Sequence, residues 1–362
     1  MSLDLVLRED EKAVFKLREL YNKYGYAPYK MSKFEEYDLY AVNKEFLVSD
    51  NVITFTDTDG KLMALKPDVT LSIIKNTKIE KGVQKVYYDE NVYRVSKGTK
   101  SYKEIMQVGL ECMGEVDDYS VSEVIALALK SLNIISDEFY LDISSLDLIN
   151  GIFKQVGLDE ASKKQMLTYL AQKNANGVQS VCEIQNLSSA QTELLVALVK
   201  TYGNAKKVAS VLKGFELDSD TEIALDKLVE VIESLSPLGF EDKINVDFSV
   251  VNDLNYYNGF VFKGFVSGIP TGILSGGQYD KLMQKMNKKT KAIGFAVYLD
   301  ELSRLSAKVS EYDVDVAIEY GNASLKQVNQ VVEKYVASGK SVFADKKISS
   351  DCKYAELVKL GE

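Results

Sequence analysis

Histidine is absent from all 362 positions of the sequence. Its side chain titrates near neutral pH, and it is the commonest transition-metal ligand in proteins. The absence therefore excludes Ser–His and Cys–His nucleophile pairs, histidine-ligated zinc and histidine proton shuttles. Most hydrolase mechanisms are removed by this one feature.

Cysteine is scarce as well, with only Cys112, Cys182 and Cys352 in the chain. The three are odd in number, far apart and outside any CxxC spacing, which argues against a disulfide framework and against a zinc site. We expect them to be small buried hydrophobic residues. We predict no metal and no cofactor.

Long apolar runs and excess positive charge are also lacking. No apolar stretch approaches the roughly 20 residues that cross a bilayer, and the first residues carry acids where a secretory signal carries basic ones. We therefore expect a cytosolic protein without a membrane partner. With 44 basic and 53 acidic side chains, the net charge is −9, which on average repels nucleic acid, so we expect no nucleic-acid partner.

The overall composition is that of an ordinary globular protein, 46% hydrophobic and long enough for two or three domains.

Amphipathic spacing predicts a helix over 9–24. Asp59 with Gly60 predicts a hairpin between strands at 52–55 and 62–65, followed by a helix that opens at Pro67. Hairpins and loops rather than regular crossover helices join the strands, so we predict an α+β fold, an antiparallel sheet flanked by helices. The further predicted strands are 83–88, 104–112, 140–143, 244–248, 259–265 and 271–274.

Two changes of pattern suggest the domain organisation. Between 146 and 237, four or five helical runs with polar, glycine-poor connections predict a helical insertion. After residue 310, a strand at 314–318, a helix at 325–336 and a strand at 341–343 predict a small α/β unit. We expect a core at 1–310 that carries the insertion, followed by a small, truncated C-terminal unit at 311–362.

The strand at 104–112 is the most informative segment for function. Apolar residues alternate there with Gln107, Gly109 and Glu111, so one face of the strand is polar and sterically open. On a central strand, such a face suits a small charged ligand. A half-exposed strand with a solvated polar face explains the pattern equally well.

A second candidate is the acid at the start of the helix after the hairpin, where Lys66, Pro67 and Asp68 precede Thr70. A carboxylate at this place can hold a ligand ammonium group. The simpler interpretation is favourable helix-start chemistry, an acid near the positive end of the helix dipole.

Two further segments can contribute to a pocket. Tyr256 and Tyr257 precede a strand, where they either line a cavity or simply begin the strand. Gly276 and Gly277, followed by Tyr279, end another strand. Paired glycines there allow a ligand to approach the backbone, or merely form a tight turn.

Six segments taken in order make the pattern specific. The order resembles the catalytic core of class II aminoacyl-tRNA synthetases of the histidyl type, over roughly residues 5–305, helical insertion included. The segments are LysProAspXThr at 66–70, TyrArg at 93–94, GlnXGlyXGlu at 107–111, AsnTyrTyrXGly at 255–259, GlyGlyGlnTyrAsp at 276–280 and AlaIleGlyPheAla at 292–296.

The resemblance implies a role for each candidate residue. Asp68 and Thr70 take the positions that hold the amino group of histidine, and Gln107 and Glu111 those that bind the amino acid on the central strand. The other implied pocket residues are Tyr256, Tyr257 and Tyr279, with Gly276 and Gly277 as the floor, and Arg94 as the arginine of the second signature motif.

The sequence departs from the synthetases on the nucleotide side. Asn252 stands where the family has an arginine that assists adenylate formation, Tyr298 replaces a glycine, and Glu301 replaces the arginine that clamps ATP. Losing one preorganised charge at a transition-state phosphate costs about 3 to 4 kcal/mol. Two such losses leave little adenylation, so we expect no aminoacylation activity.

A core of this type without catalysis resembles the regulatory subunits of short-form ATP phosphoribosyltransferase, which carries out the first step of histidine biosynthesis. The resemblance implies a separate catalytic subunit that needs this chain for activity and for feedback by histidine, a homodimeric core, and a hetero-octamer. It also gives the absence of histidine a rationale beside chance. The alternatives are a divergent histidyl-tRNA synthetase, an amino-acid ligase, or a stand-alone histidine sensor.

Overall fold

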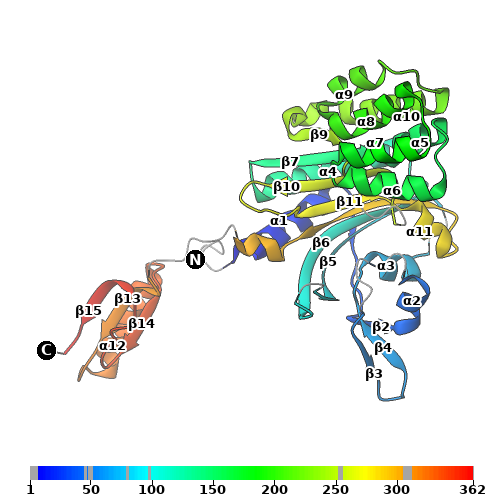
Figure 1. Ribbon diagram of the computed structural model, residues 1–362. Coiled ribbons are helices and arrows are strands. Elements are labelled where there is room, and N and C mark those ends of the chain that lie inside the picture. The colour runs from blue at the N-terminus through cyan, green and yellow to red at the C-terminus, as the bar shows by residue number, and fades with distance from the viewer. Residues whose placement is uncertain are drawn as a thin grey trace. The chain divides into compact units, whose positions relative to one another are not determined.

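The computed structural model describes residues 7–44, 47, 52–78, 81–96, 99–251, 256–304 and 312–361. Contacts within the chain separate two compact units, Glu9–Leu305 and a smaller one formed by Met1–Arg8 with Ser306–Glu362. Each unit is described by itself (Figure 1). Among the described residues, no helix is long and apolar enough to cross a membrane.

A nine-stranded sheet forms the centre of the larger unit (Figure 1). The five neighbouring pairs from β5 to β7 are antiparallel, while β1 joins β5 and β9 joins β7 in parallel. The predicted α+β fold with an antiparallel sheet is thereby confirmed. In spatial order the strands are β1 (Ala27–Pro28), β5 (Val83–Val95), β6 (Tyr102–Gly114), β12 (Lys291–Tyr298), β11 (Leu274–Gln278), β10 (Asn258–Val266), β7 (Phe139–Ser145), β9 (Ile244–Asp247) and β8 (Tyr202–Gly203).

Helices α1 (Glu9–Lys23) and α4 (Asp118–Ile135) pack together and cover one face of this sheet. Tyr21 of α1 meets Phe295 of β12 edge to face, with ring centroids 6.0 Å apart. Such burial of large apolar side chains dominates the stability of a core. The predicted helix at 9–24 is present, whereas α4 was not predicted.

The other face of β5 and β6 carries a small subdomain. Its sheet contains β2 (Phe34–Glu36), β4 (Leu62–Leu65) and β3 (Thr54–Thr56), and its helices are α2 (Tyr37–Val42) and α3 (Thr70–Asn76). The hairpin predicted at Asp59 and Gly60 joins β3 and β4, and Gly60 adopts a φ of 81° that favours glycine. A second core cluster includes Leu71 and Ile73 of α3 together with Tyr88 of β5.

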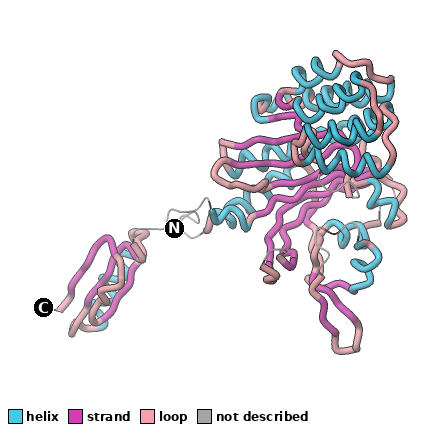
Figure 2. The backbone as a smooth tube through the Cα atoms, viewed as in Figure 1, coloured by secondary structure: helices cyan, strands magenta, loops and turns pink. Residues whose placement is uncertain are grey.

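Residues 146–237 form six α-helices rather than the four or five expected. Each begins at a Ser, Asp or Asn whose side chain accepts a hydrogen bond from a backbone N–H of the first turn. Several are short, which explains the undercount. They are α5 (Leu146–Gln155), α6 (Glu160–Ala171), α7 (Ala175–Ile184), α8 (Ser189–Lys200), α9 (Ala205–Leu212) and α10 (Ser219–Glu233), as Figure 2 shows.

Shorter elements complete the larger unit: η3 (Ser236–Leu238), η4 (Glu241–Lys243), α11 (Asp280–Lys285) and η5 (Asp300–Arg304). The strand predicted at 271–274 was misplaced, because β11 begins at Leu274. The Gly276–Gly277 pair therefore lies inside the strand rather than at its end.

The smaller unit contains β13 (Val314–Glu319), α12 (Leu325–Ala337), β14 (Val342–Asp345) and β15 (Tyr354–Lys359). Its three strands are parallel in the order β14-β13-β15. The third strand was not predicted. Cys112 and Cys182 are buried free thiols, as expected, while Cys352 is partly exposed.

Candidate functional site

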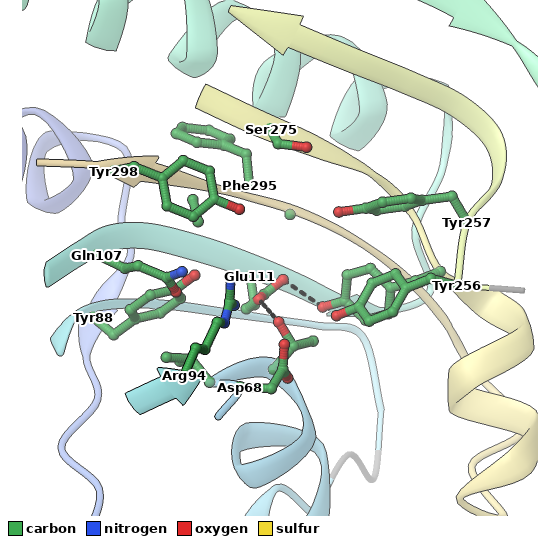
Figure 3. Close-up of a pocket in the computed structure, with 15 residues that line it drawn as sticks. Asp68, Tyr88, Arg94, Gln107, Glu111, Tyr256, Tyr257, Ser275, Phe295 and Tyr298 are labelled. Atoms are coloured by element: carbon green, nitrogen blue, oxygen red, sulfur yellow. Dashed lines mark hydrogen bonds between the residues drawn. The ribbon is translucent and has the colours of Figure 1, made fainter. Parts of the chain in front are cut away.

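A cavity of about 220 Å³ opens on the sheet face opposite α1 and α4, between the sheet and the loop that leads into α3 (Figure 3). Its walls come from four strands, from residues 68–70, from the segment before β10 and from Tyr279, which lies between β11 and α11. The lining residues are Asp68, Val69, Thr70, Tyr88, Arg94, Gln107, Glu111, Tyr256, Tyr257, Ser275, Tyr279, Gly294, Phe295, Ala296 and Tyr298.

Strand register assembles the floor of the cavity. On β6 and β12, Glu111 pairs with Gly294, Gly109 with Ala296, and Gln107 with Tyr298. A Cβ on Gly294 would lie 1.8 Å from Glu111 Oε2, so only glycine leaves room for the Glu111 side chain. The small residues Gly109, Gly294 and Ala296 in these pairs leave the space for the cavity above the sheet.

Glu111 is the buried acid at the centre of the site, with 2% of its surface exposed. Its Oε1 accepts a hydrogen bond from the Thr70 hydroxyl at 2.7 Å, and its Oε2 accepts one from the Tyr279 hydroxyl at 2.5 Å (Figure 3). Desolvation by burial raises the pKa of Glu111 to about 8, although both hydrogen bonds oppose the shift. Glu111 is therefore poised to carry a proton near neutral pH.

Asp68 lies at the entrance to α3, where its Oδ1 accepts a hydrogen bond from the Leu71 N–H at 2.9 Å. Burial raises the pKa of Asp68, while the Leu71 N–H and the Arg94 charge lower it. Asp68 therefore fits both interpretations made from the sequence. It accepts a hydrogen bond from a backbone N–H at the start of α3, and it also lines the cavity.

Tyrosines form the wall at the Glu111 end. The rings of Tyr256 and Tyr257 are 4.7 Å apart between centroids, and those of Tyr256 and Tyr279 are 6.0 Å apart. Burial raises the pKa of all three hydroxyls well above the usual range, so they stay protonated. A flat, polar-edged ligand group fits such a wall.

Arg94 and Tyr298 occupy the other end. Arg94 Nε donates a hydrogen bond to the Pro67 carbonyl at 3.0 Å. Burial raises the pKa of the Tyr298 hydroxyl, although the Arg94 charge lowers it, so Tyr298 keeps its own proton available for donation. Of the lining residues that the structure describes, Arg94 is the one cation.

Sequence comparison identifies the family. The protein-family model described as histidyl-tRNA synthetase matches residues 6–302 of this chain. The ATP phosphoribosyltransferase regulatory subunit of Caldanaerobacter subterraneus subsp. tengcongensis is 31% identical over 79% of this chain and 76% of the relative. The chain belongs to the ATP phosphoribosyltransferase regulatory subunit family. The predicted family is thus confirmed.

Solved structures agree on the fold of this regulatory subunit family. A Bacillus halodurans protein described as an ATP phosphoribosyltransferase regulatory subunit/histidyl-tRNA synthetase has a TM-score of 0.78 at 23% identity, covering 97% of this chain and 94% of its own. A chain of the ATP phosphoribosyl transferase (HisG:HisZ) complex from Thermotoga maritima has a TM-score of 0.63 at 17% identity, covering 80% and 97%. The class II synthetase-like fold predicted from the sequence is confirmed.

The structure brings together eight of the ten residues predicted for the ligand site of this family member. Gln107 and Glu111 are buried in the cavity, so the alternative of a solvated polar strand face is excluded for them. Gly276 and Gly277 do not line the cavity. Because neighbouring strand residues point to opposite faces, a side chain at 276 would meet Phe262 and Phe295, whereas Gly277 lies against the Tyr257 ring. The eight that line it are Asp68, Thr70, Arg94, Gln107, Glu111, Tyr256, Tyr257 and Tyr279.

The sequence reasoning did not assign Tyr88, Ser275 or Ala296 to the site. Ser275 and Ala296 could have been found from strand alternation. Ser275 lies two residues before Gly277 on β11, and Ala296 lies two residues after Gly294 on β12, so each shares a sheet face with that glycine. Of the three departures from the synthetase pattern, Tyr298 lines the cavity and Glu301 lies in η5, outside its walls. Asn252 falls outside the described residues.

Proposed function

We propose that this chain is the non-catalytic regulatory subunit of an ATP phosphoribosyltransferase, and that histidine acts through its cavity as the feedback effector. Its membership of the regulatory subunit family supports the role. The observation that carries the effector proposal is the cavity itself, which two buried acids line together with a single arginine among the described lining residues. A free amino acid carries the complementary charges on its α-ammonium and α-carboxylate groups.

Each wall has a place in this proposal. Asp68 and the Thr70 hydroxyl hold the ligand ammonium group at the start of α3. Glu111, with its pKa raised to about 8, and Gln107 bind the imidazole, which stacks against the tyrosine wall. Arg94 takes the carboxylate. Gly276 and Gly277 contribute only through the packing of β11.

The partner in this proposal is a separate catalytic chain that joins ATP to phosphoribosyl pyrophosphate. The regulatory chain is a homodimer that assembles with catalytic chains into a hetero-octamer, without nucleic acid. Mixing the purified chain with a short-form catalytic subunit tests this directly. We expect a complex by gel filtration, a rise in transferase activity and inhibition by histidine; no complex and no change in activity would overturn the proposal.

The absence of an activity of its own is part of the same proposal. Tyr298 lines the cavity where the synthetase pattern has a glycine, and Glu301 stands where that pattern has the arginine that clamps ATP. We expect no histidine-dependent exchange between ATP and pyrophosphate. Robust exchange would instead support a divergent synthetase or an amino-acid ligase. A cytosolic location stays a prediction from the sequence.

A stand-alone histidine sensor differs from the regulatory subunit only in having no catalytic partner. Histidine binding without complex formation would favour the sensor. Complex formation without histidine binding would keep the regulatory role and remove the effector site.

A further inference from the structure

On the face of β12 that borders the cavity, the side chains increase in size along the strand. Gly294, Ala296 and Tyr298 follow one another on this face, because strand residues two apart point the same way. Gly294 leaves room for Glu111, and Ala296 faces Gly109. Tyr298, opposite Gln107, is the large residue that ends the row (Figure 3).

The Tyr298 hydroxyl and the Arg94 guanidinium both line the cavity. Arg94 is anchored through Nε, which donates to the Pro67 carbonyl at 3.0 Å. A guanidinium has five N–H donors, so donors remain after this hydrogen bond. The Tyr298 hydroxyl has its own O–H to donate to a ligand. Together they offer a carboxylate a cation and a neutral donor side by side.

Tyr298 limits the space for a longer ligand. Among the described lining residues, no second cation stands beyond Arg94 to neutralise a phosphate. A group attached to the ligand carboxylate would meet the phenol ring of Tyr298.

We propose that Tyr298 closes the cavity at the Arg94 end, so that the site accepts free amino acids with an unmodified carboxylate and rejects carboxyl esters and acyl adenylates. Tyr298 is thus a specificity-determining residue. The proposal deepens the proposed function and rests on it, since it assumes that the cavity holds an amino acid.

The test is calorimetric titration of the full-length chain with L-histidine, L-histidine methyl ester and a sulfamoyl analogue of histidyl adenylate. The variants are Tyr298→Gly, which opens the end, and Tyr298→Phe, which keeps the ring and removes the hydroxyl. Tyr140→Gly is the matched control, because Tyr140 is an exposed tyrosine of the same sheet that does not line the cavity. It reports the cost of glycine in a strand.

The wild type and Tyr140→Gly are expected to bind histidine and to reject the ester and the analogue by at least about tenfold. Tyr298→Phe is expected to bind histidine about tenfold more weakly, since a hydrogen bond to a charged group is lost, and still to reject the analogue. Tyr298→Gly is expected to bind the analogue at least about tenfold better than the wild type does.

Three results would overturn the inference. These are a wild type that binds the ester or the analogue as tightly as histidine, a Tyr298→Gly variant that gains nothing for the analogue, and a wild type that does not bind histidine. If Tyr298→Gly does not fold, Tyr298→Ala replaces it. The preference of the wild type for histidine over the ester and the analogue tests the inference without either variant. Complex formation with the catalytic subunit reports separately on the proposed regulatory role.

Discussion

Glu111 and Thr70 are joined by a hydrogen bond of 2.7 Å that links the central strand β6 to the start of α3. The hydroxyl donates and the carboxylate accepts, at a place where Glu111 is almost fully buried. The bond ties the Glu111 end of the cavity to the small subdomain. A change of charge at Glu111 therefore affects both the cavity and the packing of α3.

Glu111→Gln keeps the shape and removes the group that can give up a proton. We expect histidine affinity to fall by roughly ten- to a hundredfold, because the amide cannot become the charged acceptor that Glu111 becomes when it transfers its proton in a desolvated site. Calorimetry measures the affinity. Glu104→Gln is the control, an exposed glutamate on the same strand. Equal affinity for the Glu111→Gln variant and the wild type would contradict the assigned role.

Glu111 also makes stability depend on pH. Its pKa of about 8 in the folded chain lies above the model-compound value of 4.5, so between these values the folded state holds a proton that the unfolded state has lost. Stability is then full below pH 4.5 and declines as pH rises to about 8, by at most about 1.4 kcal/mol per pH unit. Asp68, whose pKa is also raised, acts in the same direction.

Denaturant unfolding from pH 5 to pH 8 checks this. The difference in unfolding free energy between Glu111→Gln and the wild type is expected to grow in favour of the variant as pH rises. A difference that stays constant with pH would show that Glu111 titrates normally.

Lys66 and Glu90 form a buried ion pair next to the site. Lys66 has no exposed surface, and its Nζ lies 3.1 Å from Glu90 Oε2. Burial lowers the pKa of Lys66, and Glu90 opposes the shift. We expect Glu90→Gln to destabilise the chain by about 3 kcal/mol, because it leaves a buried charge without its partner.

The matched control for that pair is Glu36→Gln, which removes the exposed partner of Lys61. Its effect on unfolding is expected to be too small to resolve. Chemical denaturation of both variants makes the comparison. Similar stabilities for the two variants would contradict the account of Lys66.

Gly294→Ala tests the floor of the cavity. The added methyl group would lie 1.8 Å from Glu111 Oε2 and 2.5 Å from the Leu110 carbonyl, so the Glu111 side chain and the pairing of β12 with β6 must both shift. We expect histidine binding to fall below detection in calorimetry while complex formation is kept. Gly214→Ala, whose new Cβ meets nothing closer than 3.1 Å, is the control. Retained binding in Gly294→Ala would remove Glu111 from the ligand site.

The sequence predicted the polar face of β6 because period-two alternation is readable wherever one face is apolar. It did not predict α4, a helix that is buried around most of its surface. It placed Gly276 at a strand end because paired glycines are typical of turns, whereas the packing of Phe262 and Phe295 requires glycine within β11.

The placement of Tyr298 and Arg94 in one cavity was also beyond the sequence. The substitution at 298 was visible as a departure from the synthetase pattern, but its neighbours depend on the pairing of β12 with β6 and of β6 with β5. Such register arises from tertiary packing and not from local pattern. The same holds for the side-chain partners of Glu111.

The most direct test of the central claim is the histidine dependence of transferase activity in a complex reconstituted from this chain and a short-form catalytic subunit. We expect activity to require this chain, histidine to inhibit it, and Glu111→Gln to raise the inhibitory histidine concentration by roughly ten- to a hundredfold. Activity that is independent of this chain, or inhibition that Glu111→Gln leaves unchanged, would contradict the account.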